Sequence, residues 1–263
     1  MNASIKDEQT HFGFETIERT EKNARVAAVF DSVAKKYDVM NDVMSFGVHR
    51  LWKDWYVWQC QVKAGEHVLD LAAGTADISK RLAKRLCGKG FGADICGRLV
   101  VSDINGSMLA VGEERMRAAG WLQNVEYAIA NAEDLPFPDN SFDLVTMAFG
   151  LRNVTNQDKA LSEMYRVLKP QGRALVLEFS HPIGNLLNRA YDFYSFNFLP
   201  LMGDLIAKDR ASYQYLAESI RMHPKQETLK EMFAEAGFIH CEYQNLSGGI
   251  CAIHKGVKGD GGQ

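Results

Sequence analysis

The stretch Val68-Leu69-Asp70-Leu71-Ala72-Ala73-Gly74-Thr75-Ala76-Asp77 decides the fold of this 263-residue chain. Its first four residues predict a short buried strand that runs directly into a turn of small residues. Apolar residues then recur at helical spacing over residues 78–86, and a second apolar strand, residues 99–101, is followed by Asp103. Strand, small-residue turn, helix, strand and terminal acid form the α/β half-fold that holds a ribose at the carboxyl end of a parallel sheet.

The composition of the turn indicates which nucleoside it binds. A dinucleotide turn needs several glycines because its backbone must approach a pyrophosphate closely, whereas here Gly74 is the only glycine between alanines. No lysine follows the turn as it does in a P-loop. The turn therefore favours a cofactor without phosphates, and S-adenosylmethionine meets that requirement. A plain strand-to-helix turn without a ligand is the alternative interpretation.

Charge and cysteine content limit the classes of partner. The net charge of -3 and the pI near 6.2 give no electrostatic support to nucleic-acid binding. The five cysteines are odd in number and include no C-x-x-C pair, so we expect reduced thiols in a cytoplasmic protein and no bound metal. The polar N-terminus resembles neither a secretory signal nor a transit peptide, and no apolar run reaches the roughly 18 residues that span a bilayer.

Helices and strands alternate along most of the chain. We expect helices over residues 22–37 and 51–60 before the sheet, where they can either close over the cofactor site or simply pack on the edge of the sheet. Apolar strands without polar alternation follow, which is typical of a parallel sheet with helices on both faces. Asn105 is a predicted helix cap, and Thr155 with Asp158 resembles a capping box. Further predicted elements are strands at 125–130, 142–147 and 174–177, a helix at 225–236, and a final hairpin at 238–243 and 249–254.

These elements predict a single domain, 1–263, in five segments. They are an N-terminal helical cap (1–64), a cofactor-binding core (65–180), an aromatic-rich lid insertion (181–222), a C-terminal helix and strands (223–256), and a disordered tail (257–263). The glycine-rich stretch 87–98 reads as a surface insertion. The aromatic residues of the lid could equally form part of the core, but an apolar cap above a sheet is also where a greasy substrate enters.

Several strings closely resemble the ubiquinone/menaquinone biosynthesis C-methyltransferase family over roughly residues 10–256. They are Phe12-Gly13-Phe14, Ala34-Lys35-Lys36-Tyr37-Asp38-Val39-Met40-Asn41-Asp42, Phe149-Gly150-Leu151-Arg152-Asn153-Val154, Arg166-Val167-Leu168-Lys169-Pro170 and Glu218-Ser219-Ile220-Arg221.

The resemblance implies a class I, seven-stranded, Rossmann-like methyltransferase fold that binds S-adenosylmethionine. It also implies methylation of a ring carbon of a polyprenyl benzoquinol (2-methoxy-6-polyprenyl-1,4-benzoquinol), of demethylmenaquinol, or of both. The cofactor contacts it implies are Thr75, Asp103, Asn131 and Ala132, and Asp70 and Gly74 are assigned to the same site. Asp103 offers two oxygens to the two ribose hydroxyls, while Asn131 can hydrogen-bond adenine.

Arg152 and Asn153 are the candidate catalytic residues. The acceptor carbon becomes a good nucleophile only as its ring hydroxyl ionises, and a phenol with a pKa near 10 is mostly protonated at neutral pH. Arg152 can favour the phenolate by charge and hydrogen bonds, and Asn153 can orient the ring oxygen or a water. An ion pair that fixes the loop is the alternative role of Arg152. His49, His181 and His223 are further candidate bases, although lone histidines are usually structural.

The sequence departs from the family pattern at three positions. The family turn usually reads Gly-Gly-Thr-Gly, but Ala73 and Ala76 replace two of these glycines, and Ala148 stands where a serine is expected. An alanine forced to a positive φ would cost stability or displace the loop. A non-catalytic scaffold of a quinone-synthesis complex, a methyltransferase for another small phenol, and, least favoured, a nicotinamide dehydrogenase are the alternatives. The expected partners are the quinol, the membrane surface through the lid, and a second copy of the chain or a quinone-biosynthesis complex.

Overall fold

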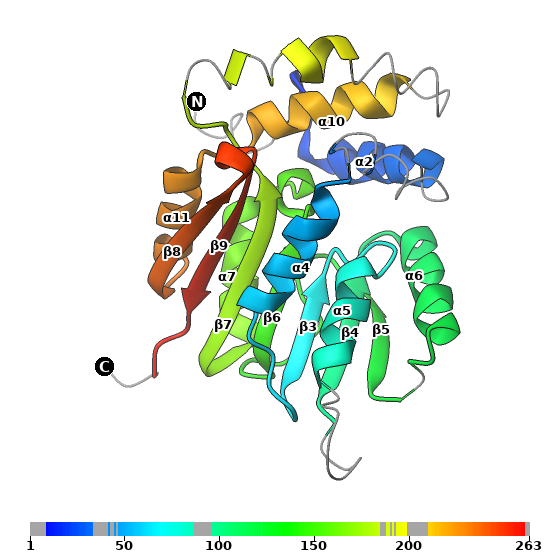
Figure 1. Ribbon diagram of the computed structural model, residues 1–263, viewed down its shortest axis with the longest axis vertical. Helices are drawn as coiled ribbons and strands as arrows, with labels where there is room; N and C mark the ends of the chain where they lie inside the picture. The colour runs from blue at the N-terminus through cyan, green and yellow to red at the C-terminus, as the bar shows by residue number, and fades with distance from the viewer. Residues whose placement is uncertain are drawn as a thin grey trace.

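A seven-stranded sheet forms the centre of the molecule (Figure 1). The computed structural model describes residues 9–33, 42, 45, 47–86, 96–121, 123–184, 188–189, 191, 193–198 and 210–260. The strand order is β5-β4-β3-β6-β7-β9-β8. The strands are β3 (His67–Leu71), β4 (Arg98–Asp103), β5 (Val125–Ile129), β6 (Phe142–Ala148), β7 (Leu168–Phe179), β8 (Ile239–Leu246) and β9 (Cys251–Val257).

The five strands β3 to β7 are parallel to one another. The strand β9 pairs antiparallel with both β7 and β8. The predicted seven-stranded sheet and the final hairpin are therefore confirmed. The strands that follow β3 in the chain lie first on one side of it (β4 and β5) and then on the other (β6 and β7). The carboxyl ends of β3, β4 and β6 therefore border a topological switch point. A ligand crevice is expected above that point.

Helices cover both faces of the sheet. On one face, α4 (His49–Gln59), α5 (Asp77–Leu86) and α6 (Gly106–Ala118) pack against side chains such as Val68 and Leu99. On the other, α7 (Gln157–Val167) and α11 (Gln226–Glu235) pack against Leu69 and its neighbours. Successive residues of β3 thus enter opposite cores, which explains why the strand is apolar on both faces.

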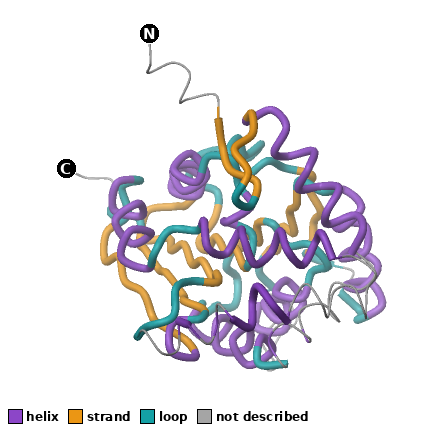
Figure 2. Tube along the Cα trace, turned by 90° about the horizontal axis from the view of Figure 1, so that it is seen from above, coloured by secondary structure: helices purple, strands orange, loops and turns teal. Residues whose placement is uncertain are grey.

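A further layer lies above the carboxyl ends of the strands (Figures 1 and 2). It comprises the hairpin β1 (Gln9–Phe12) and β2 (Glu15–Glu18), the helix α2 (Arg19–Val33), the π-helical turn η3 (Tyr194–Phe198) and the helix α10 (Arg210–Met222). The sequence analysis did not predict the hairpin, and α2 begins three residues before the predicted helix. The rest of that predicted helix, residues 34–37, lies outside the described residues.

Two local predictions are wrong. The helix α7 is capped by Asn156, whose side chain accepts from the Lys159 N–H, and not by Thr155. The tail is ordered at least to Asp260, because Val257 ends β9 and Lys258 pairs with the backbone of Gly172. The Lys258 ammonium also donates to carbonyls at the end of α7, an arrangement that secures the segment predicted to be disordered. The Asn105 cap of α6 is confirmed. Most of the predicted surface insertion, residues 87–95, lies outside the described residues.

Candidate functional site

The turn between β3 and α5 folds through three left-handed residues. Ala72, Gly74 and Ala76 have φ values of 50°, 53° and 61°. Of the two alanines that replace family glycines, Ala76 has a positive φ. The left-handed conformation costs a residue with a Cβ roughly 1–2 kcal/mol. Ala73 is not left-handed, so its replacement of glycine carries no such cost.

Asp103, at the end of β4, holds this turn in place. Its two carboxylate oxygens accept the N–H groups of Gly74 and Asn105, each at 2.8 Å. Burial raises the pKa of Asp103, while the backbone N–H donors oppose that shift. The carboxylate is thus oriented by backbone donors of the turn and of the segment before α6, and its remaining lone pairs can accept ribose hydroxyls.

A cavity opens between this turn, the ends of β4, β5 and β6, and the helix α2. Its empty volume, including the solvent at its mouth, is about 830 Å³. Its lining is mainly apolar. The described lining residues are Asn23, Val26, Ala27, Phe30, Leu71, Ala72, Gly74, Asp103, Ile104, Asn105, Met108, Ala130, Asn131, Ala132, Glu133, Ala148, Phe149, Gly150, Asn153 and Val154.

The chemistry of this lining fits S-adenosylmethionine. The charged residues among the described lining are the acids Asp103 and Glu133, and this lining includes no Lys, Arg or His. Such a surface repels phosphates and favours a positively charged sulfonium. Gly74 and Gly150 leave the turn and the end of β6 open: a Cβ on Gly150 would lie 2.5 Å from the Cβ of Ala72.

The structure brings five of the predicted site residues to the wall of this cavity: Gly74, Asp103, Asn131, Ala132 and Asn153. The Asn131 side-chain oxygen accepts the Glu133 N–H at 3.1 Å, which leaves its amide NH₂ for a ligand.

Asp70 and Thr75 are buried and are not part of the described lining. The Asp70 carboxylate accepts from the hydroxyls of Ser79 and Thr146, so it ties α5 and β6 to β3 behind the turn. Burial raises the pKa of Asp70 to about 6, against the effect of the two hydroxyl donors. Asp70 therefore supports the turn from below.

Arg152 and Asn153 belong to the short 3-10 helix η2 (Leu151–Asn153), which follows β6. The Arg152 guanidinium is buried and pairs with Glu178 at 2.8 Å, as the alternative role of this arginine anticipated. It lines a second cavity, which shares Val154 with the first. The Asn153 side-chain oxygen accepts the hydroxyl of Tyr215, from α10, at 3.0 Å. The lid helix is thereby connected directly to the candidate catalytic loop.

The backbone is strained at Phe149, just before η2. Phe149 has a φ of 57°, which is unfavourable for a bulky residue, and it is held there because its N–H donates to Leu177. The carbonyl of Phe149 accepts from the Arg152 guanidinium. Strain of this kind persists where the surrounding contacts fix it, and it is characteristic of functional sites.

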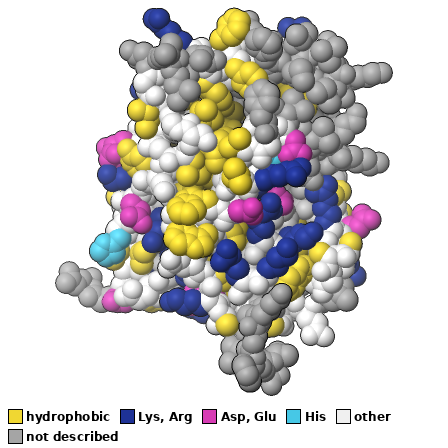
Figure 3. Space-filling view, in the orientation of Figure 1, with side chains coloured by type: hydrophobic (Ala, Val, Ile, Leu, Met, Phe, Trp, Pro, Cys, Tyr) yellow, Lys and Arg dark blue, Asp and Glu magenta, His cyan; other side chains and the backbone are white. Residues whose placement is uncertain are grey.

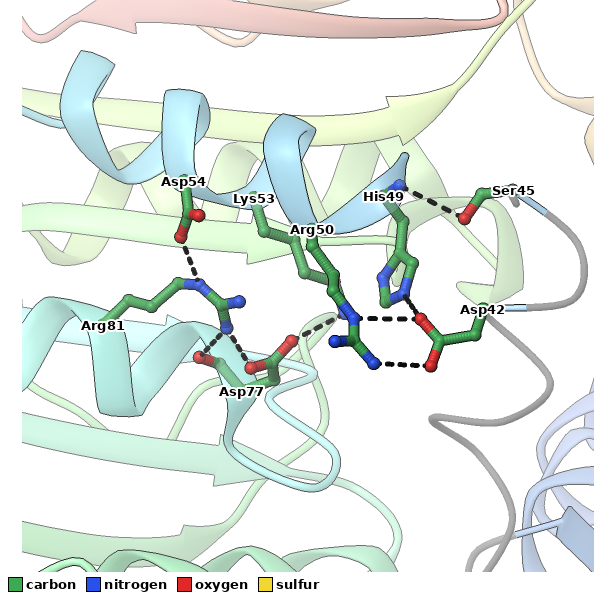
Figure 4. A network of polar contacts seen from close by, with 8 residues as sticks. All are labelled: Asp42, Ser45, His49, Arg50, Lys53, Asp54, Asp77 and Arg81. Atoms are coloured by element: carbon green, nitrogen blue, oxygen red, sulfur yellow. Dashed lines mark hydrogen bonds and ion pairs between the residues drawn. The ribbon is translucent and has the colours of Figure 1, made fainter. Parts of the chain in front are cut away.

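A network of charged residues anchors α4 to the helix that follows the turn (Figure 4). Lys53 pairs with Asp77 at 2.8 Å, and Arg81 bridges Asp77 and Asp54. Burial raises the pKa of Asp77, but Lys53 and Arg81 outweigh it and hold that pKa below its usual value. His49, one of the candidate bases, is bonded in this network to Asp42.

None of the three candidate histidines is in the described lining of either cavity. His181 is bonded to the carbonyl of His223. Burial lowers the pKa of His223 well below its usual value, so this side chain is neutral at physiological pH. His49 and His181 are thus bonded to other residues and His223 is buried, and none of the three is placed to act as the base in either cavity.

The sequence predicted that the helix corresponding to α2 could close over the cofactor site, but it did not identify the residues of that helix that line the cavity. Asn23, Val26, Ala27 and Phe30 line it at a spacing of three and four residues, on one face of the helix. That periodicity was visible, but it does not distinguish a helix face that covers a ligand from one that covers a sheet. Glu133 was also missed because it follows β5 in an irregular segment.

The described part of the chain contains neither a candidate membrane span nor a candidate metal-binding cluster. No helix there is long and apolar enough to cross a membrane. No group of three or more His, Cys, Asp or Glu residues there could hold a metal ion.

Solved structures with this fold include several methyltransferases and a [4+2]-cyclase, SpnF. A S-adenosylmethionine-dependent methyltransferase from Aquifex aeolicus aligns with a TM-score of 0.57 at 19% identity, over 85% of this chain and 96% of that one. The phosphoethanolamine N-methyltransferase 2 of Haemonchus contortus, in complex with S-adenosylmethionine, aligns with a TM-score of 0.55 at 18% identity, over 79% of this chain and 52% of that one. The chain thus has the fold of the class I methyltransferases.

Sequence comparisons give the family. The model of the ubiE/COQ5 methyltransferase family matches residues 18–258. The "Ubiquinone/menaquinone biosynthesis C-methyltransferase UbiE" of Pseudoalteromonas translucida is 58% identical over 249 residues, which cover 95% of this chain and 96% of that protein. The protein of the same name from Escherichia coli O1:K1 / APEC is 57% identical over 251 residues, 95% of this chain and 97% of that one. The chain belongs to the ubiE/COQ5 methyltransferase family and is an enzyme whose cofactor is S-adenosylmethionine.

Proposed function

We propose that this enzyme transfers the methyl group of S-adenosylmethionine to a ring carbon of a polyprenyl benzoquinol, 2-methoxy-6-polyprenyl-1,4-benzoquinol, or of demethylmenaquinol, in ubiquinone and menaquinone biosynthesis. The observation that carries the proposal is the identity of 58% to a ubiquinone/menaquinone C-methyltransferase along nearly the whole of both chains. The predominantly apolar cavity is consistent with an oily ring beside the cofactor.

Asp103, Asn131 and Ala132 would hold the nucleoside, and Gly74 would leave room for the methionine end. When bound, the cofactor supplies an electrophilic methyl group on a cationic sulfur. The enzyme's own contribution is to bring the ring carbon into line with that methyl, which by itself can supply several kcal/mol. Asp70 and Thr75 contribute through the conformation of the turn.

Arg152 would stabilise negative charge on the ring oxygen as the carbon attacks. Its pairing with Glu178 fixes its position. A protonated guanidinium has no lone pair with which to accept a proton, so Arg152 is not the base. Asn153 would orient the ring oxygen, since its side chain is already held by Tyr215.

We also propose that the lid contacts the membrane from which a prenylated substrate must come. In the described part of the lid, Ile183 and Phe193 expose about 60% of their surface, and Phe196, stacked on Phe14, exposes 39%. Figure 3 shows hydrophobic side chains near the top of one face, over the layer that lies above the carboxyl ends of the strands. Exposed aromatic residues of this kind are typical of protein surfaces that insert into the lipid interface.

Quinone profiling of cells that lack the protein tests the substrate. The proposal expects a quinone that lacks one ring methyl group to accumulate, and restoration of the normal quinone by the wild-type gene. An unchanged quinone pool would contradict it. Calorimetry with S-adenosylmethionine distinguishes the enzyme from a non-catalytic scaffold, which would not bind at millimolar cofactor.

A further inference from the structure

Residues of η2 and the segment after it line two cavities, and Val154 lines both. They differ in charge. Asp103 and Glu133 are the charged residues in the described lining of the cofactor cavity. The described lining of the second cavity, which has an empty volume of about 740 Å³ including the solvent at its mouth, instead contains four basic side chains and one acid, Asp158. The basic residues are His11, Arg19, Lys22 and Arg152.

This difference matches the charges of the proposed reaction. The methyl donor is a cation, and the ring oxygen of the acceptor becomes an anion as its carbon attacks. A phenolate would be repelled by Asp103 and Glu133 but attracted by the second cavity. A ring seated beside Val154 can present its carbon to one cavity and its oxygen to the other.

Lys22, on α2, is a buried amine in the lining of this second cavity. Its side chain is 5% exposed, and its ammonium donates to the Val154 carbonyl at 3.0 Å. Among the described residues, no carboxylate lies within ion-pair distance of it. The charge of Arg152, by contrast, is already compensated by Glu178.

We propose that the second cavity receives the ring hydroxyl of the acceptor and that Lys22 is the general base that removes its proton. The inference rests on the proposed function and adds the oxygen-binding side of the acceptor site and a proton acceptor. Arg152 stabilises the resulting oxyanion but remains protonated throughout.

The surroundings of Lys22 support this role. Burial lowers its pKa to about 8, Glu133 acts in the opposite direction, and Arg19 lowers it further. His11, Arg152 and Asp158 also line the cavity that it faces. A buried lysine with a pKa of about 8 is partly neutral at physiological pH and can accept a proton.

The proton and electron balance closes without another reactant. The neutral Lys22 amine takes the hydroxyl proton, and the ring carbon ortho to that oxygen forms a bond to the methyl carbon. The bond from methyl to sulfur breaks, and its electron pair stays on sulfur. The ring carbon then releases its hydrogen as a proton to solvent while the oxygen recovers the proton from Lys22, so each turnover releases one proton.

Two substitutions separate a base from a structural lysine. Lys22→Arg keeps the positive charge and a donor for the Val154 carbonyl but cannot lose a proton. Lys22→Met removes both. The exposed Lys84→Met, on α5, is the control. The assay follows methyl transfer to a short-chain prenyl quinol between pH 6 and 9.5, with cofactor affinity measured by calorimetry.

We expect kcat of the wild type to rise about tenfold per pH unit up to a pKa of about 8 and then to level off. Lys22→Arg should lower kcat about 100-fold or more, with KM and cofactor affinity nearly unchanged, and should abolish the break near pH 8. Added ethylamine should partly restore Lys22→Met but not Lys22→Arg. The 15N resonance of Lys22 in the cofactor-free protein should titrate near pH 8, a readout independent of activity.

Wild-type rates and pH profile in Lys22→Arg would overturn the inference, as would a Lys22 resonance that titrates above pH 10. If Lys22→Met fails to fold, Lys22→Arg and the titration still decide the question. A wild-type enzyme that binds cofactor but methylates no quinol would instead contradict the proposed function.

Discussion

Asp103→Asn is the substitution that most sharply separates cofactor binding from folding. The wild-type carboxylate accepts one backbone N–H on each oxygen, from Gly74 and from Asn105, at 2.8 Å. In the amide, one oxygen becomes an NH₂ group that faces a backbone donor. The buried N–H that loses its acceptor should cost about 1–3 kcal/mol of the free energy of unfolding.

The effect on S-adenosylmethionine is estimated from the same bonds. Hydrogen bonds to a charged acceptor contribute about 1.5–3 kcal/mol each, and Asp103→Asn removes the charge and one acceptor for the ribose hydroxyls. A loss of about 2–3 kcal/mol raises Kd about 30- to 150-fold. Isothermal titration calorimetry measures Kd, and thermal melting measures stability.

The exposed Glu114→Gln, on α6, makes the same chemical change away from the cavity and should alter neither quantity. If Asp103→Asn binds S-adenosylmethionine with a Kd within threefold of the wild-type value, Asp103 does not hold the ribose and the assignment of the cavity is wrong.

Three further predictions concern the turn, the buried acid beneath it and the lid. Gly150→Ala should lower the free energy of unfolding by about 1–3 kcal/mol in denaturant melts, because the new Cβ would lie 2.5 Å from that of Ala72; an unchanged midpoint would show that the turn can move. Burial raises the pKa of Asp70 to about 6 from 3.8, so ionisation costs the wild type stability as the pH rises from about 4 to 6. Asp70→Asn stays neutral, and its stability relative to the wild type should increase by about 2–3 kcal/mol over that window; parallel pH profiles would refute this. The double substitution Phe193→Ser and Phe196→Ser should reduce flotation with lipid vesicles without changing the Kd for the cofactor, and equal flotation would exclude the lid as the contact.

The sequence was sufficient for the parts of the fold that depend on periodicity and local chemistry. Patterns within a few residues predicted three features: the strand before Gly74, the acid Asp103 at the end of β4, and the Asn105 cap. The structure has all three. The hairpin β1–β2 was missed because its strands have only four residues each, too few for a clear alternation.

Longer-range contacts account for the differences at the site. Whether Asp70 faces a ligand or the core depends on Ser79 and Thr146, which lie on α5 and β6. The position of Arg152 depends on Glu178, which is 26 residues away in β7. Spacing along the chain does not encode such pairings, whereas the packed sheet brings them together.

The most direct test of the account is a single turnover experiment with S-adenosylmethionine that carries a 13C-labelled methyl group and a short-chain prenylated quinol kept reduced. Carbon-13 NMR of the product identifies the atom that receives the label. The account predicts a labelled methyl group bonded to the ring carbon beside a hydroxyl. A label on a ring oxygen, or no transfer by protein that binds the cofactor, would contradict it.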